Sequence, residues 1–392
     1  MNRLLEHHSL SRADLAEVTG LNKSTVSSLI QNLLDYQIVR EVGLSSSGVG
    51  RPSMLLELNP EAGYIVSCEI GVDTILIGCA NFGAEIIWRY REDTRHRHGQ
   101  QAIIERVLAL LDEAIATGER LCRTCGGLLG IAIGVPGLVD HDTGTLLFAP
   151  NLGWQDVPLR AILQERFENV TVFVENEANM AALGEYFFGA ARGCDEVLFI
   201  SAGVGLGGAL IRDGNLLHGA TGFAGEFGHM TMDPDGALCN CGNQGCWETQ
   251  VSQTALFRTI RHAIQSGRSS LLSASTGGDL DRLTVPLVVE AARAGDPVAL
   301  YALEQVGHDL GIGIASLVNA LNPELIVVGN ILSLAGEFVL PAVEAELHRR
   351  ALPWNANGMR IVPAQHGFEA CVMGGVAIVY QAVLSQPGRI LG

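Results

Sequence analysis

Two stretches of the chain repeat one order of elements, and this repeat constrains the fold more than any other feature. Residues 64–90 read as an apolar strand, a glycine-containing turn at 71–74, a second strand, a tight turn and a third strand. Residues 196–214 repeat that order around a glycine-rich turn at 201–208. Segments with helical periodicity follow both stretches. The pattern predicts a duplicated α/β unit with a ligand cleft between its halves.

One short segment of the second half has the composition of a metal site. It holds one histidine and three cysteines: His229, Cys239, Cys241 and Cys246. Three thiolates and an imidazole are donors that a tetrahedral structural Zn²⁺ prefers, and four protein ligands leave no open position for catalysis. The spacing therefore predicts one structural zinc ion per chain. The alternative is a set of unrelated buried thiols.

The composition excludes several functional classes. The net charge is −17 for 392 residues, so the surface as a whole does not attract nucleic acid or anionic membranes. The apolar runs are broken before they reach about 18 residues, and residues 1–8 lack a signal-peptide pattern. Nine cysteines, an odd number, favour metal binding or burial over a disulfide framework. We expect a cytoplasmic protein without a membrane partner.

The first sixty residues predict a winged helix-turn-helix domain. A capping box at Ser11 opens a short helix, Gly20 ends it, and Asn22 caps a second helix. Two strands joined by a Gly/Ser loop follow and form a wing. The face of the second helix that is expected to be buried is apolar: Val26, Leu29, Ile30, Leu33 and Leu34.

The opposite face of that helix is polar and free of acidic side chains, which suits contact with phosphates and base edges. An arginine at the tip of the wing is placed to enter a minor groove. The predicted DNA contacts are Asn22, Lys23, Ser24, Thr25, Ser27, Ser28, Gln31 and Arg51. The alternative is a small helical domain that binds protein. One winged domain makes few phosphate contacts, so we expect a homodimer or homotetramer on palindromic double-stranded DNA.

Further polar residues fall where strands end. Asn176 and Glu177 end a strand and begin a helix, and the turn loops at 133–137 and around Asn151 belong to the same half. Such groups suit a polyol, although capping or turn chemistry explains any one of them alone. The glycines at 203–208 fit either a phosphate-binding loop or a glycine-rich hairpin.

Together these residues resemble the ROK family of sugar-responsive repressors and sugar kinases, over nearly the whole chain. The most specific motif runs from Glu226-Phe-Gly-His229 through Cys239-Asn-Cys241 to Cys246-Trp-Glu248, and is similar to the family's zinc loop and sugar site. The resemblance implies a duplicated actin-like (ribonuclease H-like) ATPase fold, and implies that His229 binds both zinc and a sugar hydroxyl. The predicted contacts to a monosaccharide effector are Asn151, Asn176, Glu177, Glu226, His229 and Glu248.

The resemblance also separates repressors from kinases. The family's kinases typically carry a catalytic aspartate where this chain has Glu177, Asp-x-Gly-Gly-Thr where it has Glu69-Ile-Gly71-Val72-Asp73-Thr74, and Gly-Gly where it has Gly329-Asn330. Misplacing a base by about 1 Å can cost on the order of 100-fold in rate. An added carboxylate opposes the charge neutralisation that phosphoryl transfer needs. We therefore expect no catalytic residue at Glu177 and no enzyme.

The expected function is that of a ROK repressor of sugar catabolism or transport genes, similar to the xylose-repressor branch, with a sugar inducer in the cleft. One alternative is an ATP-dependent, glucokinase-like sugar kinase with an appended DNA-binding domain. Another is a repressor controlled by a protein partner.

Three domains are expected. The winged helix occupies 1–60, and a first, sugar-binding α/β subdomain occupies 61–188. A second α/β subdomain at 189–392 carries the zinc loop and the oligomerisation surface. The helix predicted at 370–385 would pack back on the first subdomain.

Overall fold

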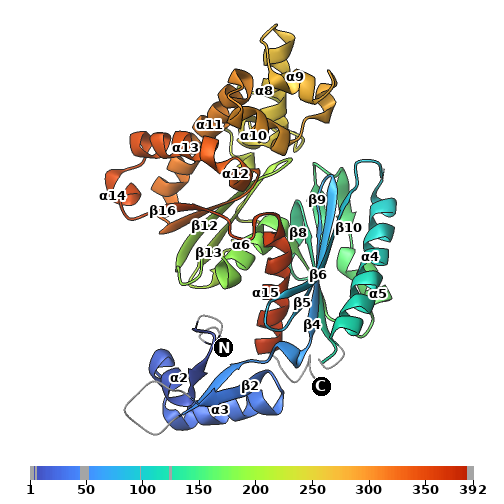
Figure 1. Ribbon diagram of the computed structural model, residues 1–392, viewed down its shortest axis with the longest axis vertical. Helices are drawn as coiled ribbons and strands as arrows, with labels where there is room; N and C mark the ends of the chain where they lie inside the picture. Colours follow the sequence, from blue (N-terminus) through green and yellow to red (C-terminus); the bar gives the residue numbers. More distant parts are fainter. Residues whose placement is uncertain (1–3, 5–6, 45–52, 98, 123–125, 386–392) are drawn as a thin grey trace.

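A computed structural model of the protein describes residues 4, 7–44, 53–97, 99–122 and 126–385. A small N-terminal domain lies at one end of two larger α/β halves (Figure 1). Its strands pair in the order β1-β3-β2, and two helices cover them. The tip of the wing, with Arg51, lies outside the described residues. The elements of this domain are β1 (Leu10–Ser11), α2 (Arg12–Thr19), α3 (Lys23–Asp35), β2 (Val39–Leu44) and β3 (Met54–Leu58).

Local signals set the helix ends in this domain as predicted. The Ser11 Oγ accepts from the Asp14 amide at 3.2 Å, and the Asp14 carboxylate accepts from the Ser11 amide at 2.9 Å. Gly20 ends α2 with φ of 68°, and Asn22 caps α3. The prediction of a buried Leu29 is wrong, because that side chain is 48% exposed. Only Val26 and Ile30 of α3 are fully buried in the small domain. The face of α3 that packs against the rest of the domain is therefore narrower than the apolar face predicted from the sequence.

The first half is built on a five-stranded sheet of order β11-β7-β4-β5-β6. β5 runs antiparallel to both of its neighbours, and the remaining pairs are parallel. A small sheet of order β10-β9-β8 belongs to the same half. The elements of this half are η1 (Pro60–Ala62), β4 (Tyr64–Ile70), β5 (Thr74–Asn81), β6 (Ile86–Asp93), α4 (Gln100–Leu121), β7 (Leu128–Val135), β8 (Leu138–Asp140), β9 (Thr145–Ala149), β10 (Trp154–Val157), α5 (Leu159–Arg166), β11 (Val172–Asn176) and α6 (Glu177–Phe188).

The second half repeats this sheet. Its order is β14-β13-β12-β15-β16, with β13 antiparallel to both neighbours and the other pairs parallel. The predicted duplication is therefore confirmed strand by strand. The elements of this half are β12 (Glu196–Ala202), β13 (Leu206–Arg212), β14 (Asn215–Leu216), η2 (Phe227–His229), α7 (Glu248–Val251), α8 (Gln253–Gln265), α9 (Leu271–Ser275), η3 (Leu280–Arg282), α10 (Val285–Arg293), α11 (Pro297–Leu321), β15 (Leu325–Asn330), α12 (Ile331–Leu334), α13 (Gly336–Arg350), α14 (Pro353–Ala356), β16 (Arg360–Pro363), η4 (Gly367–Glu369) and α15 (Ala370–Ser385).

The glycine-rich stretch of the second half is shorter as a turn than the sequence suggests. β13 begins at Leu206, and Gly207 and Gly208 pair with Ser201 and Ile200 of β12. The turn itself therefore comprises only residues 203–205. The prediction of a glycine-rich hairpin is therefore confirmed for Gly207 and Gly208, because both pair with residues of β12.

The last helix, α15, returns to the first half. It packs against α6, β4 and β7, while α4 packs on β4 and β5. The crossing with α6 is close because a Cβ on Gly374 would lie 1.7 Å from the Met180 carbonyl oxygen. Within the described residues, residues 367–385 form the one helical stretch long and apolar enough to cross a membrane, but 61% of it is buried inside the protein. It is a core helix of the fold.

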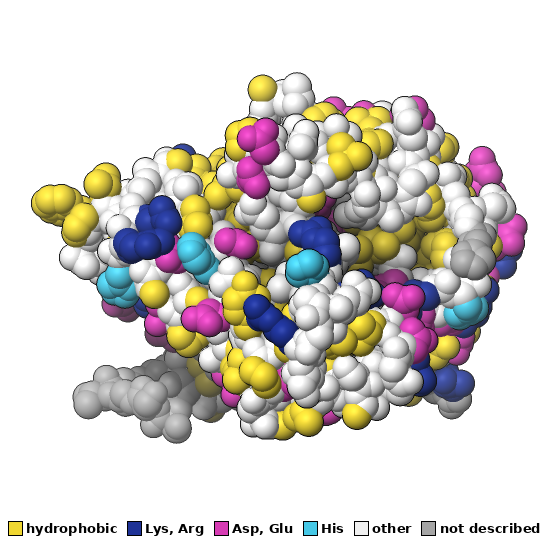
Figure 2. All heavy atoms as spheres, turned by 90° about the horizontal axis from the view of Figure 1, so that it is seen from above, with side chains coloured by type: hydrophobic (Ala, Val, Ile, Leu, Met, Phe, Trp, Pro, Cys, Tyr) yellow, Lys and Arg dark blue, Asp and Glu magenta, His cyan; other side chains and the backbone are white. Residues whose placement is uncertain are grey.

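The outer helices of the second half form a mixed surface. Figure 2 shows hydrophobic, acidic and basic side chains interspersed there, with hydrophobic groups projecting at the left edge, the side on which α14 lies in Figure 1. Leu352 is 56% exposed and Trp354 is 85% exposed.

Candidate functional site

A pocket lies between the two halves and is lined by all six residues predicted to contact a sugar. Asn151, Asn176 and Glu177 come from the first half, and Glu226, His229 and Glu248 come from the second. The turns at 71–73 and 203–205, and Asn330, line the same pocket. The structure thus brings together polar groups that are far apart in the sequence.

Asn176 is fixed by the junction of β11 and α6. Its Oδ1 accepts from the amides of Ala178 and Asn179 at 2.8 and 3.2 Å, which caps the helix. Its Nδ2 donates to the Gly137 carbonyl oxygen at 3.0 Å. The Asn176 side chain therefore caps α6 and also holds the start of that helix against the 133–137 loop.

Glu177 is the first residue of α6 and faces the pocket. Its Oε2 is enclosed, and no described residue gives it a hydrogen bond. Burial raises the pKa of Glu177 to about 8, and the nearby Glu69 and Glu226 carboxylates add to this shift. Burial also raises the pKa of Glu69 to about 7. Near neutral pH, Glu177 is therefore mostly a protonated carboxyl that can donate a hydrogen bond to a ligand.

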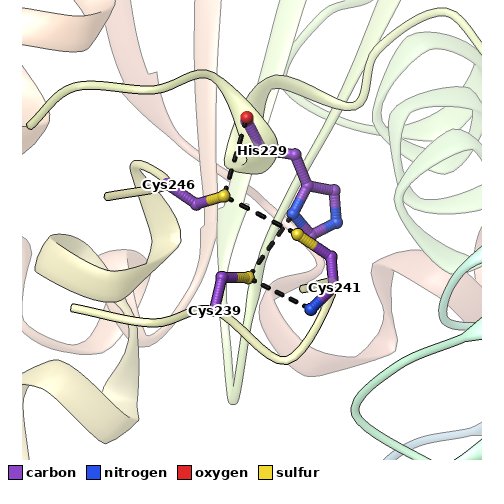
Figure 3. A group of neighbouring side chains, drawn as sticks. All are labelled: His229, Cys239, Cys241 and Cys246. Carbon is purple, nitrogen blue, oxygen red and sulfur yellow. Dashed lines mark hydrogen bonds between the residues drawn. The ribbon is translucent and has the colours of Figure 1, made fainter. Parts of the chain in front are cut away.

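The histidine and the three cysteines form one cluster (Figure 3). Cys241 Sγ lies 3.7 Å from Cys246 Sγ, and Cys239 Sγ lies 3.8 Å from His229 Nδ1. A tetrahedral Zn²⁺ separates two sulfur ligands by about 3.8 Å, and a sulfur from a nitrogen ligand by about 3.6 Å. The donor set and these separations fit such an ion. Burial raises the pKa of the Cys239 thiol, so deprotonation there needs a cation.

The cluster is joined to the pocket by side chains. Cys239 Sγ lies 2.8 Å from Glu248 Oε1, and Glu248 Oε2 accepts from the Leu206 amide at 3.3 Å. His229 presents Nδ1 to Cys239 and Nε2 to Glu226, whose Oε2 is 3.8 Å away. One ring nitrogen can thus bind a metal while the other faces a ligand.

The cysteine loop also contacts the first half. Asn240 Nδ2 donates to Asn151 Oδ1 at 2.8 Å, a bond between the two halves. Sequence reasoning gave Asn240 no role, because nothing in its spacing indicates a partner 89 positions away. Gly205 was also missed as a close contact: a Cβ there would lie 2.7 Å from Glu248 Oε2 and 2.8 Å from Asn151 Nδ2.

The predicted DNA-contacting residues of α3 form an exposed polar surface. Asn22, Lys23, Ser24, Thr25, Ser27, Ser28 and Gln31 are all exposed. Some of these side chains bond within the domain: Ser24 donates to Asn22, and Gln31 donates to Asp35. Arg12 and Arg40 pair with Glu41 and Glu57, whereas Lys23 forms no ion pair within the described residues.

Comparison with known proteins assigns the family. The ROK family model matches residues 65–382. The xylose repressor of Caldicellulosiruptor bescii is 35% identical over 387 residues, which cover 99% of this chain and 96% of the repressor. The glucokinase of Halalkalibacterium halodurans is 37% identical over 322 residues, which cover 81% of this chain and 95% of the kinase.

A solved structure supports the same assignment. The crystal structure of a ROK family transcriptional regulator, a homologue of the E. coli MLC protein, matches with a TM-score of 0.81 at 28% identity, covering 97% of this chain and 94% of that one. The family match spans both halves of the duplicated fold, including the cysteine cluster of the second half, and the chain belongs to the ROK family.

Proposed function

We propose that the chain is a sugar-responsive transcriptional repressor of the xylose-repressor type, acting in the cytoplasm on genes of sugar catabolism or transport. One observation carries the proposal. The match to the C. bescii repressor covers 99% of the chain and so includes the N-terminal domain, whereas the match to the glucokinase covers 81%. The exposed polar face of α3 gives that extra domain a surface suited to DNA.

DNA recognition is assigned to the N-terminal domain, residues 1–60. The α3 residues described above would contact phosphates and base edges, and Arg51 would enter the minor groove. Two such domains in a homodimer or homotetramer would bind a palindrome. The exposed Leu352 and Trp354 near α14 offer apolar area that a second copy could cover.

The sugar would bind in the pocket between the subdomains at 61–188 and 189–392. Carboxylates and amides of both halves would share its hydroxyl groups: Asn151, Asn176, Glu177, Glu226, His229 and Glu248. A ligand held by both halves favours the closed state. Sugar releases DNA only to the extent that it binds the DNA-incompetent state more tightly.

Zinc is proposed as the structural ion of the cysteine cluster, one per chain. When bound, it would neutralise the thiolates and cross-link the loop. The chain's own residues then carry the effect to the sugar. Cys239 contacts Glu248, His229 faces Glu226, and Asn240 donates to Asn151. The loop would therefore position four of the six sugar contacts: Asn151, Glu226, His229 and Glu248.

The test uses full-length protein and a duplex selected from a random library on that protein. Anisotropy measures affinity for the duplex with D-xylose, D-glucose or no sugar. We expect one sugar to weaken DNA binding on the order of 10-fold, a typical coupling. Glu226→Gln should lose the sugar response and keep DNA binding, whereas Lys23→Ala should keep the sugar response and weaken DNA binding a few-fold. Sugar binding without any change in DNA affinity contradicts the proposal.

A sugar kinase is the second candidate. It is favoured by the two turns, 71–73 and 203–205, that line the same pocket as the sugar contacts. Sugar-dependent ADP formation from Mg²⁺-ATP, abolished in Glu177→Gln, would establish it. Absence of ADP formation, with sugar binding intact, supports the repressor. The resemblance described above, in which Val72, Asp73, Glu177 and Asn330 stand where the family's kinases typically carry other residues, favours that outcome.

A further inference from the structure

A second cluster of metal-ligand side chains lies apart from the cysteine loop. His141 Nδ1 is 3.3 Å from Glu175 Oε2, and the rings of His141 and His218 have centroids 5.1 Å apart. One ligand atom from each of the three residues lies within 4.8 Å of the others. Glu175 is 6% exposed, whereas the two histidines reach solvent.

The Glu175 carboxylate is held in one orientation. Its Oε1 accepts from the Asn176 amide at 2.8 Å and from Asn179 Nδ2 at 3.0 Å. Oε2 is thereby directed at His141. The turn that carries His141 is also fixed, because Arg160 donates to the carbonyl oxygens of His141 and Asp142. Hydrogen-bonded, pre-oriented ligands of this kind are typical of metal sites.

The donor set fits a divalent transition metal. Two imidazoles and a carboxylate are the ligands of three-coordinate protein sites for Zn²⁺, which keep a further position for water. Ligand atoms 2.0–2.2 Å from a tetrahedral ion are about 3.4 Å apart. The His141–Glu175 distance already matches, and a ring nitrogen of His218 lies within 4.8 Å of the other two ligand atoms. A simple ion pair explains His141 beside Glu175 but gives no reason for the second imidazole.

We propose that His141, Glu175 and His218 bind a second divalent ion of the Zn²⁺ type. The ligands come from both halves of the fold. His141 follows β8 and Glu175 lies in β11, whereas His218 follows β14. Glu175 directly precedes Asn176, and the segment from His218 leads to Glu226. A metal bound here joins the two halves beside the pocket, whether or not the pocket takes a sugar.

Zinc titration of the full-length protein tests the site. The protein is dialysed against a mild chelator and titrated with ZnCl₂ by calorimetry, and total zinc is counted by plasma emission. We expect two equivalents in the wild type. His218→Ala and Glu175→Gln should each retain one, with affinity at the lost site falling at least 10-fold.

The control is His262→Ala, an exposed histidine on α8 outside the cluster, which should keep two equivalents. Cobalt substitution distinguishes the sites, because thiolate charge-transfer absorption arises only at the cysteine loop. Melting temperatures without added zinc show that the variants are folded. A wild type that binds no zinc outside the cysteine loop, or a His218→Ala protein that binds as much zinc as the wild type, overturns the proposal.

Discussion

The two halves each contain a five-stranded sheet of the same topology, and they differ in the segments that join the strands. In the first half, residues 94–127 connect the third strand to the fourth, with α4 as their helix. In the second half, residues 217–324 make that connection and carry the cysteine cluster and five helices, α7 to α11. The corresponding turns at 71–73 and 203–205 read Gly-Val-Asp and Gly-Val-Gly. The repeated strands form the scaffold, and the cysteine cluster lies where the repeat is broken.

The largest effect should come from a change in residues 217–324 of the second half, which carry the cysteine cluster. Cys246→Ser removes a buried member of the cluster, and we expect loss of the bound metal, a lower melting temperature and loss of sugar binding. Cys79→Ser makes the same chemical change in the buried sheet of the first half and should keep the metal. Metal content and calorimetric melting measure both variants. Equal metal content in the two variants would show that residues 217–324 hold no metal site.

The second largest effect should distinguish the turn at 203–205 from the turn at 71–73. Gly205→Ala places a Cβ against Glu248 and Asn151, and overpacking of this kind costs about 1–3 kcal/mol. We expect sugar affinity to fall on the order of 10-fold or more. Asp73→Ala, at the corresponding position, should change sugar affinity little. Titration calorimetry with D-xylose and D-glucose compares them, and equal effects would mean that the two turns are equivalent toward the sugar.

A titration effect should distinguish two corresponding positions of the two sheets. Glu69, whose pKa burial raises to about 7, corresponds to Ser201 in the second half. The folded protein holds a proton that the unfolded chain releases above its usual value of 4.5. Stability therefore falls as pH rises from 4.5 to about 7, by up to about 1.4 kcal/mol per pH unit. Glu69→Gln should reduce this slope, leaving the part that Glu177 contributes, and Ser201→Ala should keep the whole slope, as urea unfolding across that pH range would show.

The smallest effect lies outside the repeat. Lys23→Ala on α3 should weaken DNA binding a few-fold and reduce the salt dependence by about one ion. Both halves should be unaffected, with unchanged melting temperature and sugar affinity. Anisotropy at several salt concentrations gives the slope, and an unchanged slope would remove Lys23 from the predicted phosphate contacts.

Much of this arrangement could be predicted from the sequence. The repeated order of strands predicted the duplicated sheet, and the capping residues Ser11 and Asn22 predicted where α2 and α3 begin. The cysteine cluster could be predicted from residue spacing alone, because its ligands are close in the chain. Contacts between distant segments could not be predicted this way: Asn240 with Asn151, or His141 with His218. Leu29 was misassigned because helical periodicity does not reveal how wide a face the small domain covers.

The path of α15 has a consequence for synthesis. One face of the first sheet is covered by the last described helix, so residues 64–176 are translated long before their covering element exists. Domains usually fold as the chain emerges. We expect the first half to fold only after α15 has left the ribosome, because β4 and β7 lack their covering helix until then. A stop codon at position 370, which removes α15 and the residues after it, should therefore leave the first half unfolded, although every residue of its sheet has been made.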